Sequence, residues 1–306
     1  MTADPWVAFA AAIVGGALRV GAPFLFVSLG ECLTEKSGRI NLGLEGVLVL
    51  SAVAAFGGAF LSGSPWIGAL SGACAGALLA LLHGVLCSLR GVNDVATGIA
   101  LMLLGTGLAF YLGKPLIQPQ APQLPAIPLG NWSDNSAVRA ALQVNALVPV
   151  GLVLAALLWW GFGRTRMGLL VRMAGDSADA ARALGYSVSG LRIAATTAGG
   201  AIAGLGGASL TLFYPGSWNE GISSGQGLIA VALVIFARWS PLRCVYAALL
   251  FGGAGAIGPA LQSVGVGWGY HLFNTVPYVL TLLILVATCR PGKVAAGSPG
   301  ELSSTR

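Results

Sequence analysis

Long stretches without a charged residue dominate this sequence. Only 8% of its 306 residues are charged, whereas 56% are hydrophobic. A soluble domain carries about a quarter charged residues, so this composition excludes an ordinary soluble globule. Apolar runs of this length are typical of helices that satisfy their own backbone hydrogen bonds in lipid. We therefore predict an all-α integral membrane protein.

Apolar stretches of roughly 20 residues predict about nine transmembrane helices, within a range of about eight to ten. The predicted spans are 6–30, 41–61, 66–89, 95–113, 145–163, 193–214, 223–237, 244–262 and 271–289. The seventh is short, and the first contains Arg19 and Pro23. Either segment is a candidate for a broken or re-entrant helix.

The distribution of Lys and Arg predicts how the chain is oriented. If the 164–192 segment is cytoplasmic, nearly all the cations outside the spans, from Lys36 to Arg306, fall on the cytoplasmic side, and only Lys114 and Arg139 fall outside. This is the bias that membrane proteins show, and it places the N-terminus outside and the C-terminus in the cytoplasm. The net charge of +6 therefore indicates topology and not nucleic-acid binding.

One membrane domain is expected over residues 1–290, followed by a cytoplasmic tail at 291–306. Its two larger connections are a cytoplasmic loop at 164–192 and an outer, periplasmic loop at 114–144. The outer loop is predicted to be extended or turn-rich because of its prolines, Pro115, Pro119, Pro122, Pro125 and Pro128. Tryptophans near the span ends fit an aromatic belt, namely Trp159, Trp160, Trp239 and Trp268.

Small residues recur at helical spacing in two spans. The third span carries Gly68, Gly72, Gly76, Ala80 and Gly84, and the sixth carries Gly199, Gly200, Gly204, Gly206 and Gly207. Such stripes let another helix approach closely. They predict a tightly packed bundle without indicating its function.

The cytoplasmic loop contains a short predicted helix. Asp176 or Ser177 is placed to cap it, residues 178–184 are mostly good helix formers, and Gly185 is placed to end it. Two turns are not stable alone, so this helix must pack on its own spans or on a partner. It is either an interfacial linker or a docking element.

Several polar residues stand where predicted spans begin. Asn41 is placed to cap the second span, and Gly43 and Gly46 favour a break in its first turns. Glu45 is either solvated at the membrane edge, paired with Arg39, or part of a substrate path.

The fourth and seventh spans offer similar groups. Asn93, Asp94 and Thr97 begin the fourth, either as helix caps or as the lining of an inner vestibule. Gln226 lies between two glycines at the start of the seventh and offers an amide to a neutral hydroxylated or heterocyclic solute. No set of residues suggests a catalytic or metal site, so we expect neither.

Three motifs resemble those of one transporter family. Residues 35–46 read EKSGRINLGLEG and resemble the E(R/K)SGxxNLGLEG motif of the inner-membrane permease subunits of bacterial ABC importers for nucleosides and simple sugars. Residues 172–192 resemble the cytoplasmic motif RxxGxxxxAARxLGxxVxxxR of that family. Residues 224–241, SGQGLIAVALVIFARWSP, resemble its third motif. The order and spread of the motifs, over roughly 30–260, make the resemblance to this permease family specific. The chain length resembles that of the shorter of two paired permeases in the nucleoside branch.

The resemblance implies a transport subunit and not an enzyme. The short helix would couple to an ABC ATPase, through Arg172, Asp176, Ser177, Ala178, Asp179, Ala180, Ala181, Arg182, Ala183, Leu184 and Gly185. The translocation path would use Asn41, Glu45, Asn93, Asp94, Thr97 and Gln226. ATP and Mg would bind the ATPase, because the chain has no G-x-x-x-x-G-K-[ST] motif and is expected to hold no cofactor.

The other implied partners are a second permease subunit, a periplasmic or lipoprotein substrate-binding protein and membrane lipid, in the bacterial inner membrane. Nucleosides are the first expected substrates, followed by simple sugars and other purine-like compounds. The alternative is a self-contained secondary transporter or channel for small neutral solutes. That alternative would call for an ion-coupling site and inverted repeats, and the sequence shows no convincing repeat.

Overall fold

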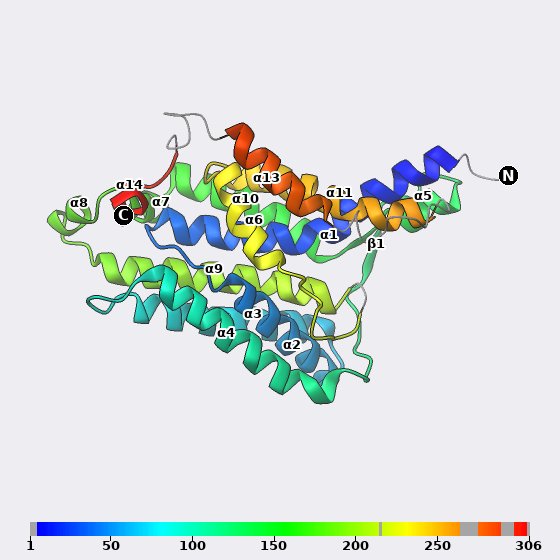
Figure 1. The fold of residues 1–306 in the computed structure, drawn as a ribbon, viewed down its shortest axis with the longest axis horizontal. Coiled ribbons are helices and arrows are strands. Elements are labelled where there is room, and N and C mark those ends of the chain that lie inside the picture. Colours follow the sequence, from blue (N-terminus) through cyan, green and yellow to red (C-terminus); the bar gives the residue numbers. More distant parts are fainter. Residues whose placement is uncertain (1–4, 214–215, 264–274, 289–296, 305–306) are drawn as a thin grey trace.

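The computed structural model describes residues 5–213, 216–263, 275–288 and 297–304, and most of them are helical (Figure 1). Nine apolar helices lie within these described ranges: α1 (Pro5–Lys36), α2 (Leu44–Ser62), α3 (Pro65–Leu86), α4 (Asp94–Gly113), α6 (Leu147–Arg164), α9 (Val188–Thr211), α10 (Gln226–Phe236), α11 (Pro241–Ser263) and α13 (Val276–Thr288). Seven of these nine helices, all except α10 and α13, are long and apolar enough to cross a membrane.

The prediction of about nine spans is therefore confirmed for seven. Helix α10 has 11 residues, and at 1.5 Å per residue it extends about 17 Å, roughly half of a bilayer core of about 30 Å. The ninth predicted span falls partly outside the described residues, which include α13 over 13 residues. Helix α1 continues through Pro23 for 32 residues, so the first segment is not broken.

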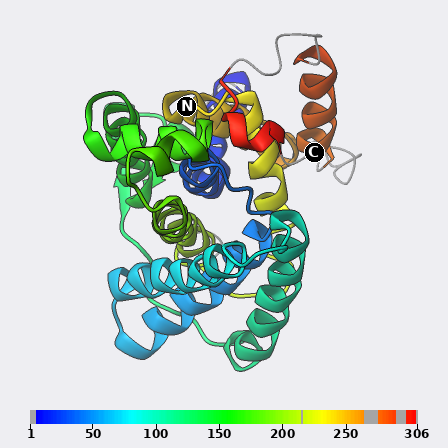
Figure 2. The same ribbon diagram turned by 90° about the vertical axis from the view of Figure 1, so that its left-hand side faces the viewer.

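The helices form two layers, which are visible in both Figure 1 and Figure 2. Helices α2, α3, α4 and α9 make one layer, and α1, α6, α10, α11 and α13 make the other. The two layers meet where α1 of one layer packs against α9 of the other. Helix α9 also packs on α2 and α3 within its own layer. Phe24, Phe26, Phe56 and Phe251 are fully buried in this bundle.

The two predicted glycine stripes pack against each other, on α3 and α9. A Cβ atom at Gly76 would lie 2.3 Å from the carbonyl oxygen of Gly200, and one at Gly204 would lie 2.4 Å from the carbonyl oxygen of Gly72. These backbones are therefore too close for any side chain. The sequence predicted close packing, and the structure shows which two helices make it.

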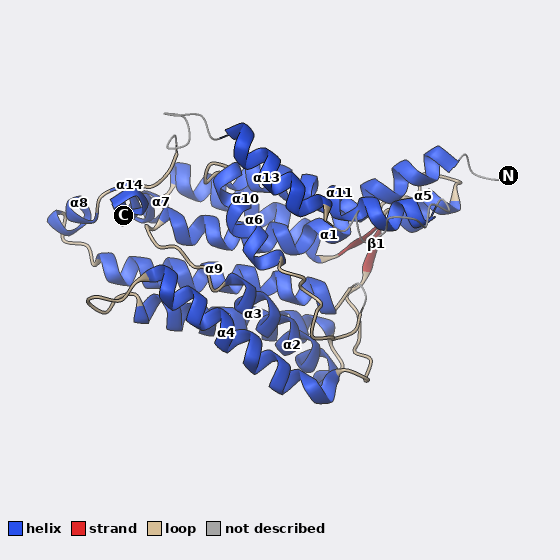
Figure 3. Cartoon of the chain, viewed as in Figure 1, coloured by secondary structure: helices blue, strands red, loops and turns tan. Residues whose placement is uncertain are grey.

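Short elements gather at the two ends of the bundle. One end, called here the α8 end, carries α7 (Arg166–Asp176), α8 (Ala178–Ala183) and α14 (Gly300–Ser304). The opposite end carries η1 (Lys114–Leu116), α5 (Ser136–Ala141) and two strands, β1 (Ala126–Pro128) and β2 (Gln143–Asn145). The strands pair antiparallel, with Ala126 opposite Asn145 (Figure 3).

The proline-rich part of the outer loop is mostly extended or turned, as predicted, whereas α5 and the strand pair were not predicted. This loop also supplies hydrogen-bond acceptors to Arg19, the one cation inside the first predicted span. The Arg19 guanidinium donates to the carbonyl oxygens of Ala140, at 2.5 Å, and Gln143, at 3.3 Å. The cation therefore meets backbone acceptors at the end of the bundle.

Candidate functional site

The connection between α1 and α2, residues 37–43, runs in an irregular conformation into the bundle and is held by side chains from other helices. Arg39 forms an ion pair with Asp94 of α4 at 2.6 Å. The His83 Nε2 atom of α3 lies 3.1 Å from the carbonyl oxygen of Ile40. These contacts partner polar groups that would be costly if left unpaired inside a membrane.

Asn41 lies in the same connection and is buried. Its Oδ1 atom accepts from the amide of Gly43 at 2.9 Å, and Gly43 itself is the N-cap of α2. The prediction that Asn41 caps the second span is therefore wrong: its side chain orders the turn that precedes the helix.

The amide of Asn41 donates to Glu31 Oε1 at 2.8 Å, and Glu31 is fully buried in α1. Sequence reasoning missed Glu31. The available signal was a carboxyl group directly after the first predicted span, where a charge inside the membrane is costly and marks a functional candidate.

Glu45 joins the start of α2 to the start of α10. Its Oε1 atom accepts from the Ser223 hydroxyl at 2.5 Å and from the Gly225 amide at 3.2 Å. Its Oε2 atom accepts from the Gly227 amide at 2.7 Å. Among the described ion pairs Arg39 is joined to Asp94 and not to Glu45, so the predicted pairing of Glu45 with Arg39 is not found.

The local backbone explains this contact. Ser224 and Gly225 have φ values of 46° and 77°, which turn the chain immediately before α10. The first amides of a helix have no partner within it and favour a negative charge, which Glu45 supplies. A Cβ atom at Gly227 would lie 2.6 Å from the Glu45 Cα atom, so the two helix starts are in direct contact. We call this contact the α2–α10 junction.

A cavity of about 410 Å³ lies next to the junction. It is formed by residues of α1, α10, α11 and α13 and by the turn before each of α10 and α13, including Phe24, Ser224, Gln226, Thr275 and Tyr278. The Gln226 Oε1 atom is buried and has no hydrogen-bond partner among the described residues. Tyr278 donates its hydroxyl to the Ser224 carbonyl oxygen at 2.6 Å. Aromatic walls with a few polar groups suit a neutral ligand.

The other predicted path residues stand at the start of α4. Asn93 is the N-cap, with its side chain accepting from the amides of Val95 and Ala96, and Thr97 donates to the Asn93 carbonyl oxygen at 2.8 Å. This confirms the capping interpretation for Asn93. Asn93, Asp94 and Thr97 do not line the cavity beside Gln226. The structure thus brings Glu45 and Gln226 together and leaves these three apart from them.

The short helix predicted in the 164–192 loop is present as α8, where Ser177 is the N-cap and accepts from the Ala180 amide at 3.2 Å. Gly185 follows it with a φ value of 83°. Ala178 and Ala181 are buried, together with Ala174 and Val188. The exposed side carries Asp179, Ala180, Arg182, Ala183 and Leu184, and Asp176 before the helix is also exposed.

Two charged residues anchor the start of α8. Glu301 accepts from the Ala178 amide at 3.0 Å and forms an ion pair with Arg192 at 3.2 Å. Arg192 also donates to the carbonyl oxygens of Ser37 and Ala174, each at 3.0 Å. The structure therefore ties α8 to α9, to the α1–α2 connection and to the C-terminal segment.

Arg172 points to a different place from α8. It lines a second cavity, together with Lys36, Arg238 and Arg243. Nearby, the Trp239 indole donates to the Glu35 carboxyl group, and Trp239 is buried. The assignment of Trp239 to an aromatic belt is therefore wrong, whereas Trp159 and Trp160 are exposed near the end of α6.

The three motifs meet in space. Residues of the first motif contact Arg192 of the second, and Glu35 and Glu45 of the first contact Trp239, Gly225 and Gly227 of the third. A half-length helix that abuts another helix start beside a cavity, inside a bundle of spanning helices, is typical of membrane transporters. The fold and site thus define a multi-pass membrane protein of the transporter class.

The chain belongs to the family described as the permease component of the branched-chain amino acid transport system, whose model matches residues 6–288. It is 29% identical to the putative glucose ABC transporter permease protein TsgC13 of Haloferax volcanii, over 97% of each chain. It is 28% identical to the nucleoside ABC transporter permease protein NupC of Lactococcus lactis, over 89% of this chain and 90% of that protein. The guanosine ABC transporter permease protein NupQ of Bacillus subtilis shows the same identity and coverage.

Proposed function

We propose that this chain is the permease subunit of an ATP-driven importer that moves nucleosides, or related sugars and purine compounds, across the inner membrane by alternating access. Family membership and the names of the relatives support the class of substrate. The observation that carries the proposal is the α2–α10 junction, where Glu45 holds the start of a half-length helix beside a cavity. A secondary transporter or channel is not favoured, because the relatives are ABC permeases.

Gln226 is the proposed solute contact in this cavity. Its buried carbonyl oxygen has no described partner, and none of the described residues lining the cavity is charged. A neutral solute with hydroxyl or ring N–H groups fits such a lining, and weak contacts favour release. Glu45 acts there as a positioning residue. Asn41 and the α4 residues Asn93, Asp94 and Thr97 are proposed to line the inner part of the path.

The α8 end is the proposed cytoplasmic face, which places the N-terminus outside and the C-terminus inside. The exposed side of α8 then couples to an ABC ATPase that binds ATP and Mg, and this chain performs no covalent chemistry. Leu184 supports the assignment, because its side chain is 66% exposed at the end of α8. A second permease and an external substrate-binding protein complete the importer around the single membrane domain, residues 1–290.

Co-purification of the ATPase tests the coupling assignment. Ala181 is unsuitable for substitution because it is buried, so we choose Leu184→Arg, with Leu129→Arg in the opposite outer loop as the matched control. Both leucines are exposed, and only the first is expected to reduce recovery of the ATPase. Equal recovery with both variants would refute the coupling role of α8.

Uptake of radiolabelled guanosine and glucose by proteoliposomes holding the complete transporter tests the substrate class. ATP-dependent uptake of guanosine above that of glucose is the expected result. Uptake of neither solute, in a complex that hydrolyses ATP when its binding protein is added, would contradict the substrate assignment.

A further inference from the structure

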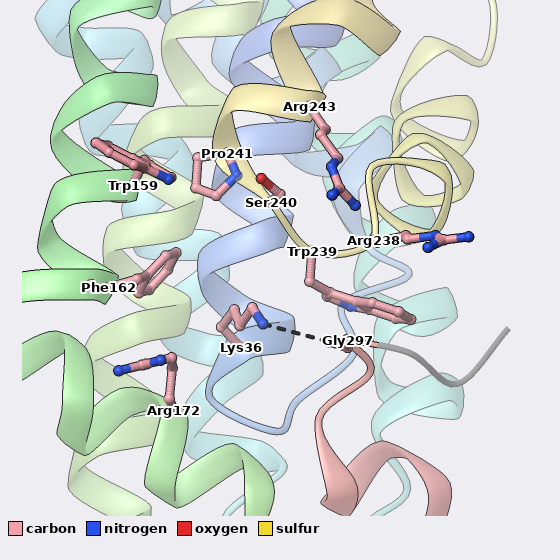
Figure 4. Close-up of a pocket in the computed structure, with 11 residues that line it drawn as sticks. Lys36, Trp159, Phe162, Arg172, Arg238, Trp239, Ser240, Pro241, Arg243 and Gly297 are labelled. Atoms are coloured by element: carbon pink, nitrogen blue, oxygen red, sulfur yellow. Dashed lines mark hydrogen bonds between the residues drawn. The ribbon is translucent and has the colours of Figure 1, made fainter. Parts of the chain in front are cut away.

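The second cavity, at the α8 end, has a volume of about 440 Å³ and lies between the ends of α1 and α6, helix α7 and the start of α11 (Figure 4). Four of its lining residues are cations, namely Lys36, Arg172, Arg238 and Arg243. They come from three separate parts of the chain: the end of α1, helix α7, and the α10–α11 connection with the start of α11. Figure 4 shows Lys36 and Arg243 nearer the centre, whereas Arg172 and Arg238 extend to its two sides. We call this cavity the basic pocket.

The charge of the basic pocket is not neutralised by the described residues. The ion pairs among them join Arg39 with Asp94, Arg182 with Asp179 and Arg192 with Glu301, none of which lines the pocket.

The polar contacts of the pocket residues lead to the same conclusion. Lys36 donates to the Gly297 carbonyl oxygen at 3.4 Å, and the buried Nε atom of Arg172 has no described partner. Glu35 adjoins Lys36 in sequence, but its carboxyl group accepts from the Trp239 indole and is buried in the bundle. The pocket thus offers guanidinium and ammonium groups to an anion.

The walls beside the pocket are apolar and exposed. On α11, Tyr246 and Leu250 lie three and seven residues after Arg243 and share its helix face, and Tyr246 is 74% exposed. On α6, Trp159 lines the pocket, and Leu152 lies two turns away on the same face; both are exposed. Since α6 and α11 pack against each other, apolar surface lies along the helices on both sides of the cationic site.

We propose that the basic pocket binds the phosphate headgroup of an anionic phospholipid whose acyl chains lie against α6 and α11. Basic pockets between membrane helices on the cytoplasmic side recognise such headgroups, and guanidinium groups bind phosphate through paired hydrogen bonds. The choice of the cytoplasmic leaflet rests on the proposed orientation. The exposed apolar faces favour a lipid as the ligand, because its acyl chains would cover these faces. An acidic protein surface would not cover them in this way.

The test measures which phospholipids stay with the complete transporter, purified in mild detergent from membranes containing phosphatidylglycerol and phosphatidylethanolamine. Native mass spectrometry compares the wild type with the double variant Arg172→Gln/Arg243→Gln. The matched control is Arg164→Gln/Arg166→Gln, which removes two exposed cations nearby that do not line the pocket. A further variant, Arg172→Lys/Arg243→Lys, keeps the charge.

The pocket variant is expected to lower the retained ratio of anionic to zwitterionic lipid by about 30-fold, which is about 2 kcal/mol, or about 1 kcal/mol per cation. The control keeps a ratio close to that of the wild type. The lysine variant keeps the charge but loses the paired hydrogen bonds, so its ratio is expected to lie between those of the wild type and the pocket variant. An equal ratio in the pocket variant and the wild type would overturn the proposal. So would an equal loss in the control, which would indicate general surface attraction.

Two further measurements distinguish the lipid from other possible ligands of the pocket. Excess inorganic phosphate that displaces the lipid as effectively as added phosphatidylglycerol would indicate a free-phosphate site and overturn the lipid assignment. Loss of the ATPase from the pocket variant with lipid fully retained would assign the cations to the ATPase instead. The lipid ratio is read independently of uptake, so failure of the substrate proposal leaves a positive lipid result standing.

Discussion

Replacing Glu45 with glutamine tests the α2–α10 junction most directly. In the native protein the two carboxylate oxygens accept three hydrogen bonds, from Ser223, Gly225 and Gly227. The glutamine amide keeps one oxygen, but it presents an NH₂ group to the Gly227 amide, so two donors face each other. Glu45→Ala removes all three acceptor contacts and leaves the helix start without a partner.

The magnitude follows from the number of bonds lost. Three bonds at the average of about 0.6 kcal/mol measured between membrane helices give about 2 kcal/mol. Three bonds to a charged acceptor at about 1.5 kcal/mol each give about 4.5 kcal/mol. Glu45→Ala is therefore expected to destabilise the protein by about 2–4.5 kcal/mol, and Glu45→Gln by less, because it keeps the oxygen that accepts from Ser223 and Gly225.

Two assays measure the effect. The melting temperature of the purified protein in detergent is expected to fall by about 5 °C or more for Glu45→Ala. Uptake by the reconstituted transporter should fall further than the amount of folded protein, because the junction adjoins the proposed path. The matched control is Glu220→Gln, an exposed carboxyl group in the loop before α10.

The outcome that would refute this reasoning is specific. If Glu45→Ala melts at the same temperature as Glu220→Gln and supports the same uptake, the three hydrogen bonds do not hold α10. If stability falls while uptake per folded molecule is unchanged, Glu45 is structural and the junction does not belong to the path.

Three further substitutions test the packing and the α8 end. Gly200→Val should abolish accumulation of folded protein, because a Cβ atom there would meet the α3 backbone at 2.5 Å. The control Gly107→Val should accumulate normally in membranes, because a Cβ atom at Gly107 has no atom within 4 Å. Trp239→Phe should lower the melting temperature by an amount equivalent to about 1–3 kcal/mol, because a buried carboxyl group loses its donor; an unchanged melting temperature would contradict this. Glu301→Ala should increase amide hydrogen exchange in α8 through loss of its contacts to the Ala178 amide and Arg192, and unchanged exchange would show that α8 is held without it.

Local rules determined much of the fold from the sequence alone. The scarcity of charge required lipid as the solvent, and apolar runs located the seven described helices that are long enough to cross a membrane, because a spanning helix satisfies its own backbone. Ser177 and Gly185 marked both ends of α8, since capping and left-handed backbone depend on adjacent residues only. The three motifs identified the family before any contact was known.

Contacts between distant residues were decided by the tertiary structure. Glu45 lies about 180 positions before the amides that it accepts from, and Arg192 and Glu301, 109 positions apart, likewise find each other far along the chain. Asn41 was misassigned because a capping residue and a residue that orders the preceding turn look alike in sequence. The basic pocket exists only because the end of α1, helix α7 and the α10–α11 connection meet at one place. Sequence periodicity specifies which face of a helix is apolar, whereas the partner of a buried polar group depends on how the helices pack.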